Sequence, residues 1–103
     1  MSSEHQPDGA ADDVLDIAVN IPEHVIFRSF ARETVALNLQ TGKFHGLNTT
    51  AGRMVEIAAR APLARDAVAE LAEEYEVPDA QIAADLADLL RLLLERGLIE
   101  TDG

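Results

Sequence analysis

The chain has 103 residues, a net charge of -11 and no cysteine, and these numbers exclude several kinds of protein. The length fits one domain, and the absence of cysteine excludes disulfides, thiolate metal sites and a cysteine nucleophile. So acidic a chain repels nucleic-acid phosphates and anionic membrane surfaces. No apolar run approaches the ~20 residues that span a bilayer, and no signal-peptide pattern is present. We therefore expect a cytoplasmic protein with no nucleic-acid or membrane partner.

Residues 1–19 are expected to form a flexible acidic tail, and residues 20–103 the folded domain. The first 16 residues contain five acids and no Lys or Arg, and they offer little that could pack. This tail is either a merely solvated terminus or a regulatory segment. The folded part is acidic as well, because taking the five acids from the 19 of the whole chain leaves 14 against 8 basic residues.

Three short strands are expected in the first half of the domain. Residues 24–30 are rich in Val, Ile and Phe. Residues 33–40 alternate, with Val35, Leu37 and Leu39 on one face, as in a half-buried strand. Thr41-Gly42 then predicts a tight turn, and residues 43–47 return as the third strand. A loop of two or three residues fits equally well, so the pairing register stays open.

Three helices are expected in the second half. The first follows the capping residues Asn48 to Thr50 and extends from Ala51 to Arg60. The second covers residues 65–75. The third begins around Pro78, where proline and the following aspartate suit a helix start, and extends to about Arg96, before the helix-ending Gly97. Strands followed by helices indicate an α+β fold.

One leucine of the third helix departs from the pattern of the others. Five apolar side chains share a broad face, the expected core face: Ile82, Leu86, Leu89, Leu90 and Leu93. Leu92 lies instead on the flank of the polar face. Because single surface leucines are common, Leu92 is either a tolerated surface residue or the edge of a groove.

No side-chain pattern indicates catalysis or a bound cofactor. The three histidines lack the spacing of metal ligands, and His45 is interpreted as a half-exposed strand residue. No serine lies in a nucleophile motif, the glycines form no phosphate loop, and the basic residues form no stripe. We expect no catalytic residue, no metal and no cofactor. A domain of this kind can bind an extended peptide along a free strand edge, but periodicity does not say which edge is open.

Two runs of the sequence resemble the PqqD-like family, the peptide-recognition domains (RiPP recognition elements) of ribosomal-peptide natural-product pathways. They are ETVALNLQTGKFHGLNTTAGRMVEIA and AEEYEVPDAQIAADLADLLRLLLERGLIE. The matching features are the LNLQTG hairpin, the GLNTT entry into the first helix, the EEY-x-V-P junction and the ERGL ending. The resemblance covers about residues 20–100. It implies a winged helix-turn-helix-like fold with a three-stranded N-terminal antiparallel sheet followed by three helices.

The resemblance also implies a non-catalytic binding function. Such domains bind the leader segment of a precursor peptide as an added strand on the third strand, in a cleft closed by the third helix. They present it to a processing enzyme, either a radical-SAM maturase for pyrroloquinoline quinone or a leader peptidase and a cyclase for lasso peptides. The implied peptide-binding residues are Lys43, Phe44, His45, Gly46, Leu47, Asp85, Leu89, Leu92 and Arg96. Many members have an aromatic residue where His45 stands.

Two other classes of protein share some of these features. A DNA-binding winged-helix regulator has the same fold, but residues 65–75 contain one Arg and three Glu, unlike a recognition helix. An acyl carrier protein is also small and acidic, but it needs an attachment serine at a helix start, and no serine follows Ser29. An open strand edge also allows a homodimer, and the sequence does not name the natural product.

Overall fold

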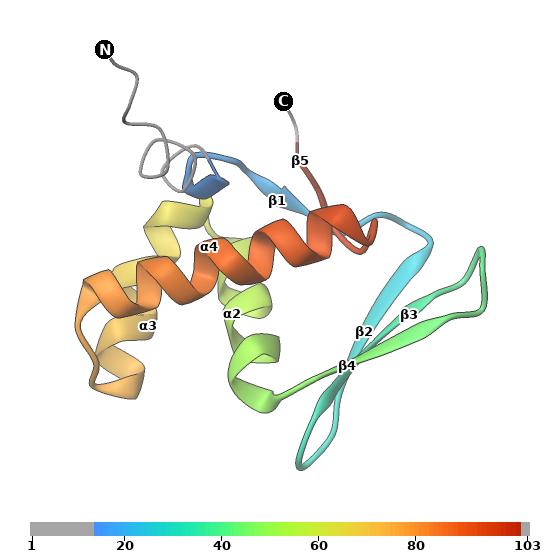
Figure 1. Ribbon diagram of the computed structural model, residues 1–103, viewed down its shortest axis with the longest axis horizontal. Helices are drawn as coiled ribbons and strands as arrows, with labels where there is room; N and C mark the ends of the chain where they lie inside the picture. Colours follow the sequence, from blue (N-terminus) through green and yellow to red (C-terminus); the bar gives the residue numbers. More distant parts are fainter. Residues whose placement is uncertain (1–13, 102–103) are drawn as a thin grey trace.

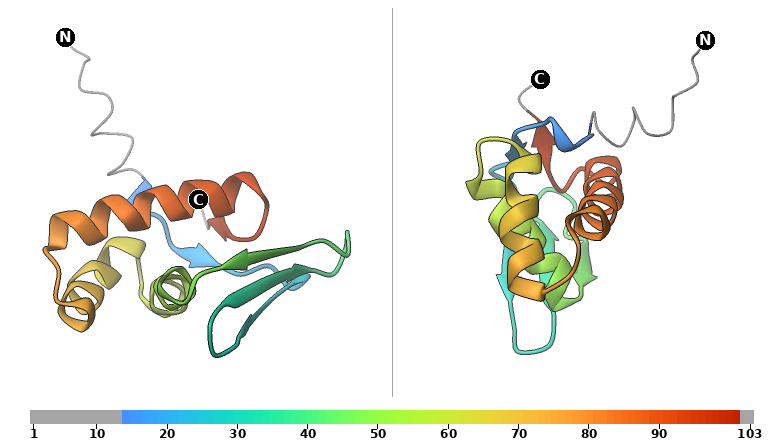
Figure 2. Two further views of the ribbon diagram at one scale, coloured as in Figure 1. Left: turned by 60° about the horizontal axis from the view of Figure 1, so that its bottom comes forward. Right: turned by 90° about the vertical axis from the view of Figure 1, so that its left-hand side faces the viewer.

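The computed structural model describes residues 14–101 as a mixed α+β fold with antiparallel sheets and three α-helices (Figures 1 and 2). The elements in chain order are β1 (Val19–Asn20), β2 (Val25–Ser29), β3 (Thr34–Asn38), β4 (Phe44–Leu47), α2 (Thr49–Arg60), the short 3-10 helix η2 (Ala64–Ala67), α3 (Val68–Tyr75), α4 (Asp79–Glu95) and β5 (Glu100–Thr101). The three predicted strands and three predicted helices are all present. The predicted chain order is incomplete, because β1 precedes and β5 follows them.

The main sheet has the order β2-β3-β4, and each neighbouring pair is antiparallel. The turn between β3 and β4 is closed by Asn38, whose backbone N–H donates to the carbonyl of Lys43 at 2.9 Å. Four residues, Leu39 to Gly42, lie inside this pair, so the predicted loop of two or three residues is wrong. The side chain of Asn38 makes the wider turn favourable because it accepts two backbone N–H bonds within it, and Gly42 adopts a φ of 77°.

The buried face of β3 carries the smaller side chains. Thr34 and Ala36 are buried, whereas Val35 and Leu37 are only half-buried on the opposite face. The apolar row read from the alternation is therefore not the core face. The reason is the close approach of α2, since a Cβ on Gly52 would lie 2.1 Å from Thr34 Oγ1. Large side chains have no room there, and they lie on the outer face instead.

The helix α4 lies across α2 and α3, and its C-terminal half extends over the sheet (Figures 1 and 2). Four of the five residues on its predicted core face are buried, namely Ile82, Leu86, Leu90 and Leu93. The fifth, Leu89, is half-buried and packs against the core. Gly97, with a φ of 72°, ends the helix as predicted. Leu98 and Ile99 then return to the core, where both are buried.

The folded part of the chain begins earlier than the sequence predicted. Leu15 and Val19 are core residues, and the backbone N–H of Ala64 donates to the carbonyl of Ile17 at 2.8 Å. Strand β1 pairs with β5 in a second, two-stranded sheet near the ends of the described chain (Figure 1). Residues 14–19 therefore belong to the folded part. The sequence prediction included them in the tail because their few apolar residues lie beside several acids. The remainder of the predicted tail, residues 1–13, lies outside the described residues.

Candidate functional site

Strand β4 forms one edge of the three-stranded sheet, and its backbone groups alternate in direction. In an antiparallel pair, opposed residues alternate between hydrogen-bonded and non-hydrogen-bonded positions. Since Asn38 donates to Lys43, the register places Phe44 and Gly46 at the non-hydrogen-bonded positions. Their N–H and C=O groups therefore point away from β3, toward the open edge.

A hollow of about 340 Å³ lies between this edge and the C-terminal part of α4. Its lining residues are Phe44, His45, Gly46, Leu47, Leu92, Leu93, Arg96 and Leu98. Leu93 and Leu98 are fully buried, and Leu92 is 38% exposed. A chain that lies along β4 would meet backbone hydrogen-bonding groups on one side and apolar side chains of α4 on the other.

A second hollow, of about 200 Å³, lies further along α4 at the start of α2. Its lining residues are Asn48, Thr50, Ala51, Met54, Asp85 and Leu89. Asn48 also caps α2, where its Oδ1 accepts the backbone N–H of Ala51 at 2.7 Å. The two hollows share no lining residue but follow one another along α4, and we call them together the groove.

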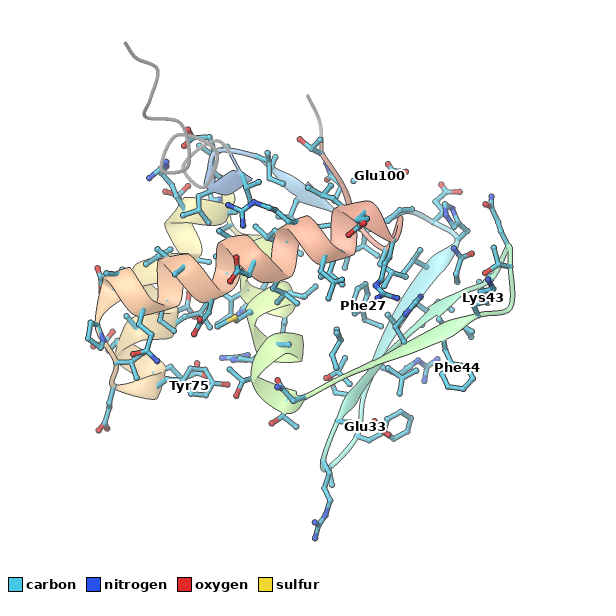
Figure 3. The ribbon with its side chains drawn as sticks, in the orientation of Figure 1. Phe27, Glu33, Lys43, Phe44, Tyr75 and Glu100 are labelled. Carbon is cyan, nitrogen blue, oxygen red and sulfur yellow. The ribbon has the colours of Figure 1, made fainter. Side chains whose placement is uncertain are left out.

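The side chains of β4 are divided between two faces. His45 is paired with the buried Ala36, so its side chain lies on the same side of the sheet as α4. Phe44 is paired with Leu37 on the opposite face, where it is 70% exposed (Figure 3). Phe44 therefore offers backbone groups to the groove, and its ring points away from it. A Cβ on Gly46 would approach only Oε1 of Glu33, at 3.3 Å, so Gly46 leaves the backbone accessible at this edge.

The charges near the groove differ from those on the rest of the helical surface. Arg96 Nη1 lies 3.3 Å from Nδ1 of His45, and this contact connects the end of α4 to β4. Elsewhere, Arg53 of α2 hydrogen-bonds to Glu74 of α3, with Nε 3.0 Å from Oε2. Hydrogen bonds to Glu74 and then to Glu56 raise the pKa of Arg53 above its usual value. The hydrogen bond from Arg53 lowers the pKa of Glu74.

The structure brings most of the predicted site residues together. Six of them line the first hollow: Phe44, His45, Gly46, Leu47, Leu92 and Arg96. Asp85 and Leu89 line the second, whereas Lys43 lines neither. Sequence reasoning missed Leu93, which it assigned to the core face of the third helix, and Leu98, which follows that helix. Both are fully buried and also border the hollow, and helical periodicity gives Leu93 a core role alone.

The chemistry of the groove is that of binding. It offers backbone hydrogen bonds, apolar contacts and the guanidinium of Arg96. Within residues 14–101, no group of three His, Cys, Asp or Glu side chains could hold a metal ion. In the same residues, no helix is both long enough and apolar enough to cross a bilayer.

An open strand edge beside an amphipathic helix defines a small α+β domain with a strand-accepting groove. The chain belongs to the PqqD family, because the family model described as "Coenzyme PQQ synthesis protein D (PqqD)" matches residues 33–99. This confirms the resemblance read from the LNLQTG and ERGL motifs. No curated protein matches the chain.

Two solved structures are similar to this chain, and both have a TM-score of 0.69. The first, "TbiB1 in Complex with the TbiA(beta) Leader Peptide", is 30% identical, and the match covers 79% of this chain and 94% of that one. The second, "Lasso peptide synthetase B1 complexed with the leader peptide", is 25% identical, with 80% and 96% covered. Both similar proteins were therefore solved with a leader peptide bound.

Proposed function

We propose that this protein is a non-catalytic recognition element that binds the leader segment of a ribosomally made precursor peptide and presents it to a processing enzyme. The leader adds as a strand to β4, in the groove beneath α4. The single observation that carries the proposal is the open edge at Phe44 and Gly46, which faces a hollow lined by Leu92 and Arg96. Similarity to two leader-peptide complexes supports it. The cytoplasmic location and the winged helix-turn-helix description belong to the same proposal.

The groove supplies the kinds of interaction that such binding needs. Ordering a disordered peptide costs roughly 2–5 kcal/mol. Backbone hydrogen bonds at Phe44 and Gly46 contribute about 1 kcal/mol each, and an apolar side chain buried against Leu92 and Leu93 contributes about 1.5–3 kcal/mol. These contributions offset the ordering cost, and they explain how a short edge without catalytic groups can hold a peptide.

Catalysis then belongs to a partner enzyme. By holding the leader, the protein raises the concentration of the precursor beside that enzyme. One of the similar structures is named a lasso peptide synthetase B1, which favours a leader peptidase of a lasso-peptide pathway over a radical-SAM maturase. The comparisons give no support to the alternative of a DNA-binding regulator.

The experiment that tests the function is a binding measurement with a charge placed in the groove. The probes are fluorescein-labelled synthetic peptides that cover the N-terminal segments of the short reading frames beside the gene. We expect one of them to bind the wild-type chain, and Leu92→Asp to weaken it ~10-fold or more, because an apolar contact of about 1.5–3 kcal/mol is lost.

Leu39→Asp is the matched control, since Leu39 is 55% exposed in the β3–β4 turn and lines neither hollow of the groove. Both variants should keep the helical circular dichroism signal of the wild type. Failure of every peptide to bind would contradict the function. Equal affinity of Leu92→Asp and the wild type would contradict the proposed groove.

A further inference from the structure

Arg96 is distinguished by what its guanidinium contacts. Four other arginines each lie within 4.0 Å of an Asp or Glu side chain: Arg53, Arg60, Arg65 and Arg91. Arg28, Arg32 and Arg96 have no such ion pair within residues 14–101, but Arg28 and Arg32 do not line the groove, whereas Arg96 does and contacts the ring of His45. In a chain with a net charge of -11, an arginine inside the groove that lacks a carboxylate needs an explanation.

The position of Arg96 at the end of α4 supplies only part of that explanation. A cation is favourable near the C-terminus of a helix, but two of the last carbonyls already accept backbone N–H groups. Leu98 donates to Leu93 at 2.9 Å, and Gly97 donates to Leu94 at 3.1 Å. The side chain of Arg96 extends toward β4 instead, where it reaches Nδ1 of His45 at 3.3 Å.

Arg96 makes one end of the groove positive, because among the described residues it is the one Lys, Arg, Asp or Glu that lines the first hollow. The acidic group of the groove, Asp85, is eleven residues before Arg96 on α4, which is ~16 Å along the helix axis. Asp85 lies near the start of α2, whose first turn contains no acid, so the helix dipole accounts for its charge. Arg96 also lies at a helix end of favourable dipole, but within residues 14–101 no Asp or Glu side chain pairs with it.

We propose that the leader carries an acidic side chain that pairs with Arg96, and that this pair fixes the register of the leader on β4. The inference rests on the proposed function. A strand added to β4 turns every second side chain toward α4, so a carboxylate at the right position meets a guanidinium already oriented by His45. Pairs of arginine and carboxylate are strong and directional. A slip of one residue would turn the acid to the outer face and break the pair.

The test is a selection from random peptides, which does not require the sequence of the leader. A yeast-displayed library is sorted for binding to the wild type, to Arg96→Glu and to Arg91→Glu. Arg91 is the matched control, because it lies on the same helix, pairs with Asp88 at 3.0 Å and does not line the groove. Circular dichroism checks that all three proteins are folded.

We expect the wild type and Arg91→Glu to enrich Asp or Glu at one fixed position relative to the apolar residues of the peptide. Arg96→Glu should enrich Lys or Arg at that same position. A peptide selected on the wild type should bind Arg96→Glu ~10-fold more weakly, the tenfold loss that corresponds to about 1.4 kcal/mol. Replacement of its acidic residue by Lys should restore binding to Arg96→Glu.

Arg96→Gln provides a second variant, which removes the charge without reversing it, and it should lose the preference for an acid. Identical peptide pools from the wild type and Arg96→Glu, or a wild-type pool with no acidic position, would overturn the charge pairing while strand binding stands. A wild type that enriches no peptide at all contradicts the proposed function itself.

Discussion

The two edges of the three-stranded sheet present similar backbone groups, but the side chains that line the hollow beside each edge differ. At β4, Phe44 and Gly46 turn their N–H and C=O groups outward. By the same alternation, Phe27 and Ser29 do so at β2. A hollow of about 340 Å³ lies beside each edge. The hollow at β2 is lined by Ile21, Phe27, Ser29, Thr34, Gly52, Val55, Glu56 and Ala59.

The difference between the residues that line the two hollows indicates which edge binds a peptide. The β4 hollow contains the cation Arg96 and is followed along α4 by a second hollow. The hollow at β2 contains one charged residue, the acid Glu56. Unpaired backbone groups supply affinity without choosing a partner, and the side chains beside them supply selectivity. We therefore propose that the leader binds at β4, and variants at each edge test whether the two edges differ in function.

The largest expected effect is on stability, at the contact between α2 and β3, the central strand that pairs with both edge strands. Gly52→Ala would place a Cβ 2.1 Å from Oγ1 and 2.6 Å from Cβ of the buried Thr34, so α2 and β3 must move apart. We expect a loss of about 3 kcal/mol in the free energy of unfolding, the upper end for overpacking, measured by urea denaturation. Gly46→Ala is the control, because its Cβ meets only a carboxylate oxygen of Glu33 at 3.3 Å. Equal urea midpoints for Gly52→Ala and the wild type would refute the close approach.

The next effect separates the two edges directly. Gly46→Pro removes an outward N–H from β4 and places a ring in the path of an added strand, while the bonds between β3 and β4 remain, as proline on an edge strand allows. We expect leader affinity to fall ~10-fold or more. Ser29→Pro makes the same change at β2 and should leave affinity unchanged in the same anisotropy assay. If the two variants weaken binding equally, the edges do not differ in function.

The smallest effect concerns the ion pair of Arg53 and Glu74, neither of which lines a hollow at either edge. The hydrogen bond from Arg53 lowers the pKa of Glu74 in the folded protein, so its stabilising contribution is present above the ordinary pKa of glutamate, about 4.3. That contribution is lost as the pH falls through the lowered folded value. Glu74→Gln should slightly reduce stability at neutral pH and flatten the loss of stability below about pH 4, as followed by urea unfolding. Leader binding at neutral pH should not change. A clear loss of affinity would show that the ion pair of Arg53 and Glu74 is not independent of peptide binding.

Much of the fold could be predicted from local patterns. The core face of α4, the cap at Asn48 and the stop at Gly97 each depend on neighbouring residues, and each is confirmed. The pairing of β1 with β5 could not be predicted, because two-residue strands at opposite ends of the domain leave no periodic signal. The buried face of β3 was unpredictable for another reason. It depends on the absence of a side chain at Gly52, on a different element.

The candidate site was predictable in part. The departure of Leu92 from the helical pattern indicated a groove, and the structure places Leu92 in the wall of a hollow. The family resemblance supplied the strand and the facing helix. Neither the pattern nor the resemblance showed which residues of β4 offer backbone groups and which offer side chains to the groove. That depends on the register set by the turn after Asn38. The exposed ring of Phe44 on the outer face follows from this register alone.

The most direct test of leader binding at β4 is amide hydrogen exchange, measured residue by residue by NMR with and without a saturating leader peptide. If the leader adds to β4, the amides of Phe44 and Gly46 exchange more slowly when it is bound, because they become donors to the added strand. The amides of Phe27 and Ser29 should exchange at the same rate in both states. Protection that appears at Phe27 and Ser29, or at neither edge, would contradict leader binding at β4.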